Sequence, residues 1–181
     1  MTTETNLPTL ASLEYVAYID DVGELPEQFQ GQIGVYAIFN HEKILQFVGY
    51  SRDVYLSLKQ HLVRQPNECY WVKVQTIERP NRTLLENLAN AWISENGPVR
   101  LATAENKENW IDPINTLLLM TDEEKTNYQN PLIDDLVKMK LVKNVARRVE
   151  AEILEVLTTR GLKTQIRFNP KLKEEGLLDL K

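Results

Sequence analysis

The fold is decided by FVGYSRDVYLSLKQH, residues 47–61. Its first residues are apolar and end at Gly49, which is typical of a β-strand that runs into a turn. The remainder has apolar residues at helical spacing, so we expect a helix over residues 53–64. A polar stripe follows the neighbouring face of this helix and consists of Ser57, His61 and Arg64. The stretch therefore predicts a strand, a turn and a helix that presents a histidine.

The flanking sequence supplies partners for this strand and helix. IGVYAIF (33–39) has the β-branched and aromatic content of a buried strand, NHEK (40–43) is a short turn, and ILQFV (44–48) is the returning strand. A third strand is expected at CYWVKVQTI (69–77) and a second helix at TLLENLANAWISEN (83–96). This order predicts an α+β fold, in which a small antiparallel β-sheet is flanked by helices.

The rest of the chain divides into two extensions around this core. Residues 1–30 carry six acidic and no basic side chains, and within this acidic N-terminal extension residues 13–19 form one strand-like run. The core is expected at residues 31–100, where basic side chains slightly outnumber acidic ones. Residues 101–181 predict a mostly helical C-terminal extension that packs on the core.

The C-terminal part contains several separate signals. Residues 99–118 lack a clear period and are typical of a loop. Thr121 followed by Glu124 is typical of a capping box at a helix start. An apolar stripe predicts a helix over residues 144–160, capped by its first residue, and residues 163–168 predict a last strand.

Composition restricts the class of protein. Of the 181 residues, 43% are hydrophobic, which is enough for a core, and no apolar run is long enough to cross a membrane. The N-terminus lacks the basic start of a signal peptide, so we expect a soluble, cytoplasmic protein without a membrane partner. The net charge of −5 argues against tight nonspecific binding of nucleic acid.

Cysteine and histidine usage restricts the metals that the chain can hold. With one cysteine, Cys69, and two histidines, a Cys/His zinc site is not expected. A metal ion would therefore be held mainly by oxygen, which makes Mg²⁺ or Mn²⁺ the candidate cofactors.

Two triplets on the predicted strands carry a resemblance to a known family. GVY stands on the first strand and FVG ends the second, a helix histidine follows, and a glutamate stands in LLEN on the second helix. In this order and spacing, residues 34–97 resemble the GIY-YIG nuclease superfamily. They are most similar to the endonuclease-like domain fused to chloroplast monothiol glutaredoxins, although the CGFS motif of the glutaredoxin module is absent. The motif residues are Gly34, Val35, Tyr36, Phe47, Val48 and Gly49.

The resemblance implies a divalent-metal-dependent DNA endonuclease. Glu86 would hold a single Mg²⁺ or Mn²⁺ ion, and Tyr36 and His61 would lie near the attacking water. The family's phosphate-facing arginine falls at a serine in this chain, so Arg64 or Arg52 would have to supply that charge.

Two departures from the pattern leave a second function open. Phe47 keeps the aromatic ring of the family's tyrosine but has no hydroxyl to donate or accept a hydrogen bond, and Tyr50 would have to replace it. Ser57 lacks the charge of the family's arginine. The alternative is therefore a catalytically inactive nuclease-like module for binding or regulation. A nucleic acid or another protein is open as partner, and the sequence does not fix the oligomeric state.

Overall fold

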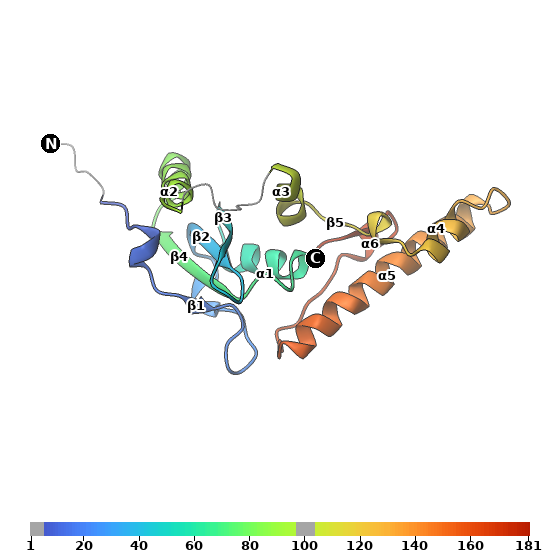
Figure 1. Ribbon diagram of the computed structural model, residues 1–181, viewed down its shortest axis with the longest axis horizontal. Coiled ribbons are helices and arrows are strands. Elements are labelled where there is room, and N and C mark those ends of the chain that lie inside the picture. Colours follow the sequence, from blue (N-terminus) through green and yellow to red (C-terminus); the bar gives the residue numbers. More distant parts are fainter. Residues whose placement is uncertain (1–5, 97–103) are drawn as a thin grey trace. The chain divides into compact units, whose positions relative to one another are not determined.

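The computed structural model describes residues 6–96 and 104–181, and the chain divides into two compact units (Figure 1). Unit 1 is Met1–Trp110 and unit 2 is Ile111–Lys181. The predicted boundary between residues 100 and 101 and the predicted end of the family resemblance at residue 97 lie outside the described residues. Residues 104–111, predicted as loop, form helix α3 (Ala104–Ile111), and this prediction is wrong there.

Unit 1 is built on a four-stranded antiparallel sheet with the order β1-β4-β2-β3. The strands are β1 (Val16–Ala17), β2 (Ile33–Phe39), β3 (Leu45–Ser51) and β4 (Trp71–Ile77). Asn40 shapes the β2–β3 turn, because its side-chain oxygen accepts hydrogen bonds from the backbone N–H groups of Glu42 and Ile44. The predicted α+β fold with a small antiparallel sheet is confirmed, although only two residues of the predicted strand 13–19 pair in the sheet.

Two helices complete the core of unit 1. They are α1 (Val54–Arg64) and α2 (Arg82–Glu95), and both agree with the predicted helices within a residue. Each begins at a polar cap: the Asp53 carboxylate accepts a hydrogen bond from the Leu56 N–H, and the Asn81 side chain accepts one from the Leu84 N–H. Short 3₁₀ turns lie at η1 (Leu10–Ser12) and η2 (Glu27–Phe29).

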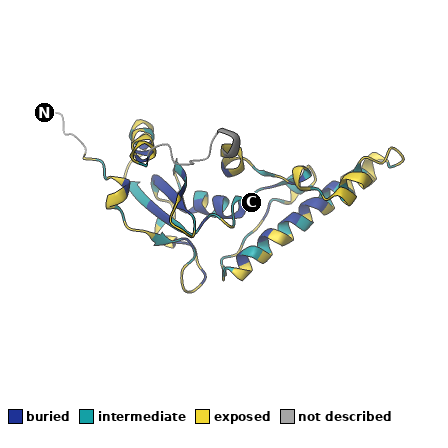
Figure 2. Ribbon diagram, viewed as in Figure 1, coloured by how far each residue is buried: buried dark blue, intermediate teal, exposed yellow. Residues whose placement is uncertain are grey.

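The side chains of β2 alternate between the two faces of the sheet, as in any strand. Val35, Ala37 and Phe39 lie in one core cluster with residues of α2, whereas Tyr36 faces the other way and reaches a side chain of α1. Figure 1 shows the strands between these two helices, and Figure 2 shows that β2 and the inner side of α1 are buried. Consecutive residues of β2 therefore lie on opposite faces of the sheet.

The N-terminal segment is part of the core of unit 1 from residue 6 onward. Leu10 is buried in the α2-side cluster. The backbone N–H groups of Leu10 and Ala11 donate to the two carboxylate oxygens of Glu95, at 2.7 and 2.8 Å. The indole N–H of Trp92 donates to the carbonyl of Pro8. These contacts attach the acidic segment to the last turns of α2.

Unit 2 is organised around a long helix. Its elements are β5 (Ile114–Asn115), η3 (Thr116–Leu119), α4 (Asp122–Tyr128), α5 (Asp135–Thr159), α6 (Pro170–Lys173) and β6 (Leu177–Leu178). β5 and β6 pair antiparallel. Both residues of the predicted capping box, Thr121 and Glu124, form it at the start of α4.

Two predictions for unit 2 are wrong. The helix predicted over 144–160 begins at residue 135, because Asp134 provides an earlier cap by accepting a hydrogen bond from the Val137 N–H. The strand predicted at 163–168 is reduced to one bridge between Phe168 and Leu180. The strand that pairs with β5 in this unit is β6, and its two residues directly follow Gly176, which has a positive φ.

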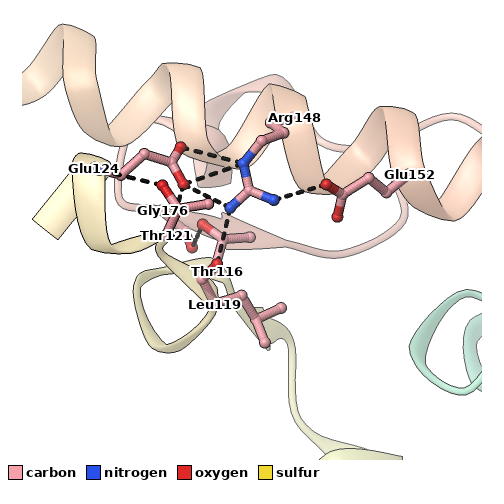
Figure 3. Close-up of polar contacts among 7 residues, drawn as sticks. All are labelled: Thr116, Leu119, Thr121, Glu124, Arg148, Glu152 and Gly176. Carbon is pink, nitrogen blue, oxygen red and sulfur yellow. Dashed lines mark hydrogen bonds and ion pairs between the residues drawn. The ribbon is translucent and has the colours of Figure 1, made fainter.

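Arg148 connects three elements of unit 2 (Figure 3). Its guanidinium donates from Nε and Nη2 to the Glu124 carboxylate, and Nη1 donates to Glu152 at 2.8 Å. Nη2 also donates to the carbonyl of Leu119. The planar fork of arginine thus joins η3, α4 and α5. None of the helices in the described residues is both long and apolar enough to cross a membrane.

Replacement of Gly34 by alanine tests the close approach of β2 and β4. A Cβ at residue 34 would lie 2.5 Å from the carbonyl oxygen of Gln75 and 3.1 Å from the Cα of Thr76, both backbone atoms that cannot rotate away. We expect Gly34→Ala to lower the free energy of unfolding by about 1–3 kcal/mol in urea titrations. Glu42→Ala in the exposed β2–β3 turn is the control and should change it by less than about 0.5 kcal/mol. Equal stability of the two variants would contradict this account.

Candidate functional site

A buried hydrogen bond joins two of the predicted site residues. The hydroxyl of Tyr36 on β2 lies 2.8 Å from Nε2 of His61 on α1, and each residue is only 4% exposed. Tyr36 stands opposite Gly49 on β3, where a Cβ would lie 2.8 Å from the Tyr36 hydroxyl oxygen. Gly49 is therefore needed because the tyrosine ring lies directly over its backbone.

Aromatic rings cover this pair. The Phe47 ring lies 4.7 Å from the His61 ring, and the indole of Trp110 stacks on Phe47 at 5.3 Å with an interplanar angle of 10°. Trp110 belongs to α3 and is 5% exposed. The absence of a hydroxyl on Phe47 is what permits this dry stack, because a buried hydroxyl would need a partner. Sequence analysis missed Trp110, which lies in a segment without periodicity.

Burial controls the protonation of the pair. Desolvation raises the pKa of Tyr36 well above its usual value, and the neighbouring Ser57 hydroxyl and Arg64 charge oppose this only in part. Desolvation lowers the pKa of His61 to about 3, and the positive charge of Arg64 contributes less to this shift. A hydrogen bond with the Trp110 backbone acts in the opposite direction and raises the pKa. Nδ1 of His61 has no hydrogen bond of normal geometry to any described residue. Both side chains are therefore neutral near pH 7.

The two predicted arginines lie in different surroundings. Nη1 of Arg64 donates to the backbone carbonyl of Trp110 at 3.0 Å, so this guanidinium helps to hold the aromatic cover in place. Arg52 is exposed after the end of β3 and lines a separate pocket. The structure thus brings Tyr36 and His61 together but does not place Arg52 with them.

Glu86 has its own partners on the α2 side of the sheet. Its Oε1 accepts hydrogen bonds from the Tyr50 hydroxyl at 2.9 Å and from Nε of Arg82 at 2.7 Å. Tyr50 stands opposite Val35 in the β2–β3 ladder, so it shares the face of the α2 cluster. The hydrogen bond from Arg82, followed by that from Tyr50, lowers the pKa of Glu86. Sequence analysis missed Arg82, although its position four residues before Glu86 is a signal for a helical ion pair.

The predicted metal ligand, Glu86, already has two partners on one of its carboxylate oxygens. One oxygen of Glu86 is already bound by a guanidinium cation and a hydroxyl, and a positive neighbour repels a metal ion. Across residues 6–96 and 104–181, no group of three or more His, Cys, Asp or Glu side chains could hold a metal. Neither Mg²⁺ nor Mn²⁺ therefore finds a prepared set of protein ligands among the described side chains.

A pocket of about 340 Å³ opens beside Tyr50 and Arg82. It lies where β3 ends, β2 begins and α2 begins. The remaining motif residues have structural positions: Val35 and Val48 pack in or against the α2-side core, and Gly34 lets β2 approach β4 closely. Unit 1 thus has two distinct polar sites, one buried and one open.

Comparison with known proteins gives one partial similarity, and no family model matches the sequence. Over 62 residues the chain is 40% identical to the bifunctional monothiol glutaredoxin-S16 of Arabidopsis thaliana, a chloroplastic protein. The matched stretch covers 34% of this chain and 21% of that protein. The similarity therefore spans about a fifth of the relative's length.

Titration of His61 tests the closed site. We expect the imidazole to stay neutral from pH 8 to about pH 4 in ¹⁵N NMR spectra, because its pKa is about 3. The unfolded ring gains its proton near its ordinary value of 6.5, so the free energy of unfolding should fall as the pH falls from 6.5 toward 3. Trp110→Ala admits water and should move the pKa of His61 upward. A midpoint near 6 in the native protein would contradict the closed arrangement.

Proposed function

We propose that unit 1 is a GIY-YIG-type domain that binds nucleic acid weakly and does not cleave it, and so serves as a binding or regulatory module. The observation that carries this proposal is the Tyr36–His61 hydrogen bond closed beneath the Phe47–Trp110 stack. A phosphodiester and its attacking water need direct access to the groups that act on them, and these groups are buried.

The protonation states support the absence of turnover. A general base or acid works best when its pKa lies near the working pH. Burial moves the pKa of Tyr36 upward and that of His61 down to about 3, in both cases away from neutrality. The Nε2 atom of His61 is also engaged by the Tyr36 hydroxyl. Neither group is available to move a proton to or from water.

The charged side chains expected to act on a phosphate have other partners. The Arg64 guanidinium donates to the Trp110 carbonyl, Ser57 is uncharged, and Glu86 is bound to Arg82 instead of pointing toward the pair. Removal of one preorganised donor commonly costs about 10²–10³ in rate. The domain lacks several such groups at once, which favours binding over hydrolysis.

The order of strands and helices and the partial similarity to the plant protein support a GIY-YIG-type origin. The GVY and FVG triplets lie on neighbouring strands and meet at their last residues, where Tyr36 pairs with Gly49 in the β2–β3 ladder. The glutaredoxin part of the relative's name does not extend to this chain, because its single cysteine, Cys69, is fully buried. A fold match alone does not establish activity, and the chemistry of the site supports a binding module.

A plasmid-nicking assay tests the proposal directly. Purified protein, Glu86→Ala and Trp110→Ala are each incubated with supercoiled DNA and Mg²⁺ or Mn²⁺. We expect no nicking above background from any of the three. Fluorescence anisotropy should still detect oligonucleotide binding in the range of about 10⁻⁴–10⁻⁶ M, weakening as salt is added.

Three results would overturn the proposal. Metal-dependent nicking by the native protein that disappears in Glu86→Ala would establish an active endonuclease. Nicking only by Trp110→Ala, abolished again when His61→Ala is added, would establish an enzyme that is held closed by its aromatic cover. Absence of both nicking and oligonucleotide binding would remove nucleic acid as the partner.

A further inference from the structure

The open pocket of unit 1 has an apolar floor and an aromatic wall. Ile33, Pro80 and Leu85 supply its apolar surface, and the ring of Tyr50 stands beside them. Its volume of about 340 Å³ lies within the usual range of small-molecule sites. A flat, weakly polar ring system can lie on such a floor and displace water from it.

Two cations stand at the edges of this pocket. Arg52 follows β3, and Arg82 opens α2. Among residues 6–96, Arg52 has no ion pair or side-chain hydrogen bond with another described residue. Arg82 uses its Nε–H for Glu86 and also interacts with the Tyr50 hydroxyl, and its guanidinium has further N–H groups that can donate to another acceptor. The positive end of α2 adds to the attraction for an anion at the same place.

Glu86 holds two residues of the pocket lining, Tyr50 and Arg82, by hydrogen bonds. By accepting hydrogen bonds from both Tyr50 and Arg82, its carboxylate joins the aromatic wall to one of the two cations. Two arginines against one carboxylate leave a net positive charge, which matches a ligand with one or two negative charges. Planar guanidinium groups bind phosphate oxygens particularly well.

We propose that this pocket binds one nucleotide, either free or at the end of a single strand, with the base on the Ile33–Leu85 floor beside Tyr50 and the phosphate between Arg52 and Arg82. The inference rests on the proposed function, since it assigns the ligand site of a domain that binds without cleaving. The nucleotide is favoured over a simple anion because the pocket joins an apolar surface with two phosphate-binding side chains.

The test is a titration of the full chain with three probes, followed by ¹H–¹⁵N NMR. Adenosine monophosphate should shift the amide signals of Ser51, Arg52 and Arg82 in a saturable way. Adenosine alone and inorganic phosphate alone should bind at least about tenfold more weakly, because each keeps only half of the contacts. A 5′-phosphorylated single-stranded oligonucleotide then distinguishes a terminal nucleotide from the free one.

Three variants separate the pocket from general charge effects. Arg52→Ala should weaken nucleotide binding by about tenfold or more, through loss of a charge-assisted hydrogen bond. Arg79→Ala removes the same charge from the loop between β4 and α2, at a residue outside the pocket lining, and should have little effect. Glu86→Gln should strengthen binding roughly fivefold, because its amide oxygen still accepts from Tyr50 and Arg82 while the competing negative charge is gone.

Each outcome decides the inference. Equal losses in Arg52→Ala and Arg79→Ala, or weaker binding by Glu86→Gln, would overturn it, and so would a lack of saturable shifts at millimolar adenosine monophosphate. Saturable binding of either the free or the terminal nucleotide with the expected order of variants supports it. Failure of the proposed function is seen separately, as metal-dependent nicking or as loss of oligonucleotide binding. Oligonucleotide binding without saturable nucleotide binding at this pocket overturns this inference alone.

Discussion

The position of β2 between two partner strands is the constraint on which unit 1 depends. Its backbone pairs with β3 on one side and β4 on the other, so neither edge of the strand can shift without breaking a full ladder. Alternation then sends Val35 toward α2 and Tyr36 toward α1. The two faces of the sheet therefore differ: aromatic rings cover the Tyr36 side, and the α2 side has a pocket lined in part by arginines.

Burial changes the protonation that a tyrosine, a histidine or a glutamate adopts. In water, a tyrosine hydroxyl beside an imidazole would be an exchangeable proton pair. Under the Phe47–Trp110 stack the charged forms of both groups are disfavoured, and the pair acts as a neutral link between β2 and α1. On the other face, Glu86 keeps its charge because a guanidinium and a hydroxyl stabilise it. The two faces of the sheet thus hold a neutral, buried pair and a charged, exposed carboxylate.

Much of the unit 1 fold follows from local sequence, and the candidate site follows only in part. The β-branched and aromatic content of 33–39 and the helical spacing of apolar residues in α1 and α2 are local signals, and each predicted its element correctly. The Tyr36–His61 contact was expected as part of one pocket with Glu86, but Glu86 lies on α2, where its carboxylate accepts hydrogen bonds from Tyr50 and Arg82. Trp110 escaped prediction because a long-range ring stack leaves no periodic trace, and Asp134 escaped because several polar residues before α5 can act as caps.

The attachment of residues 8–11 to α2 has a consequence for how the domain can be dissected. Leu10 fills a place in the same cluster as Val35 and Trp92, and Glu95 binds the two backbone N–H groups that follow the turn. A fragment that begins at residue 31 would lack Leu10 and would expose the indole of Trp92. The minimal autonomous domain is therefore longer at its amino end than the predicted core of residues 31–100, because Leu10 belongs to its hydrophobic cluster.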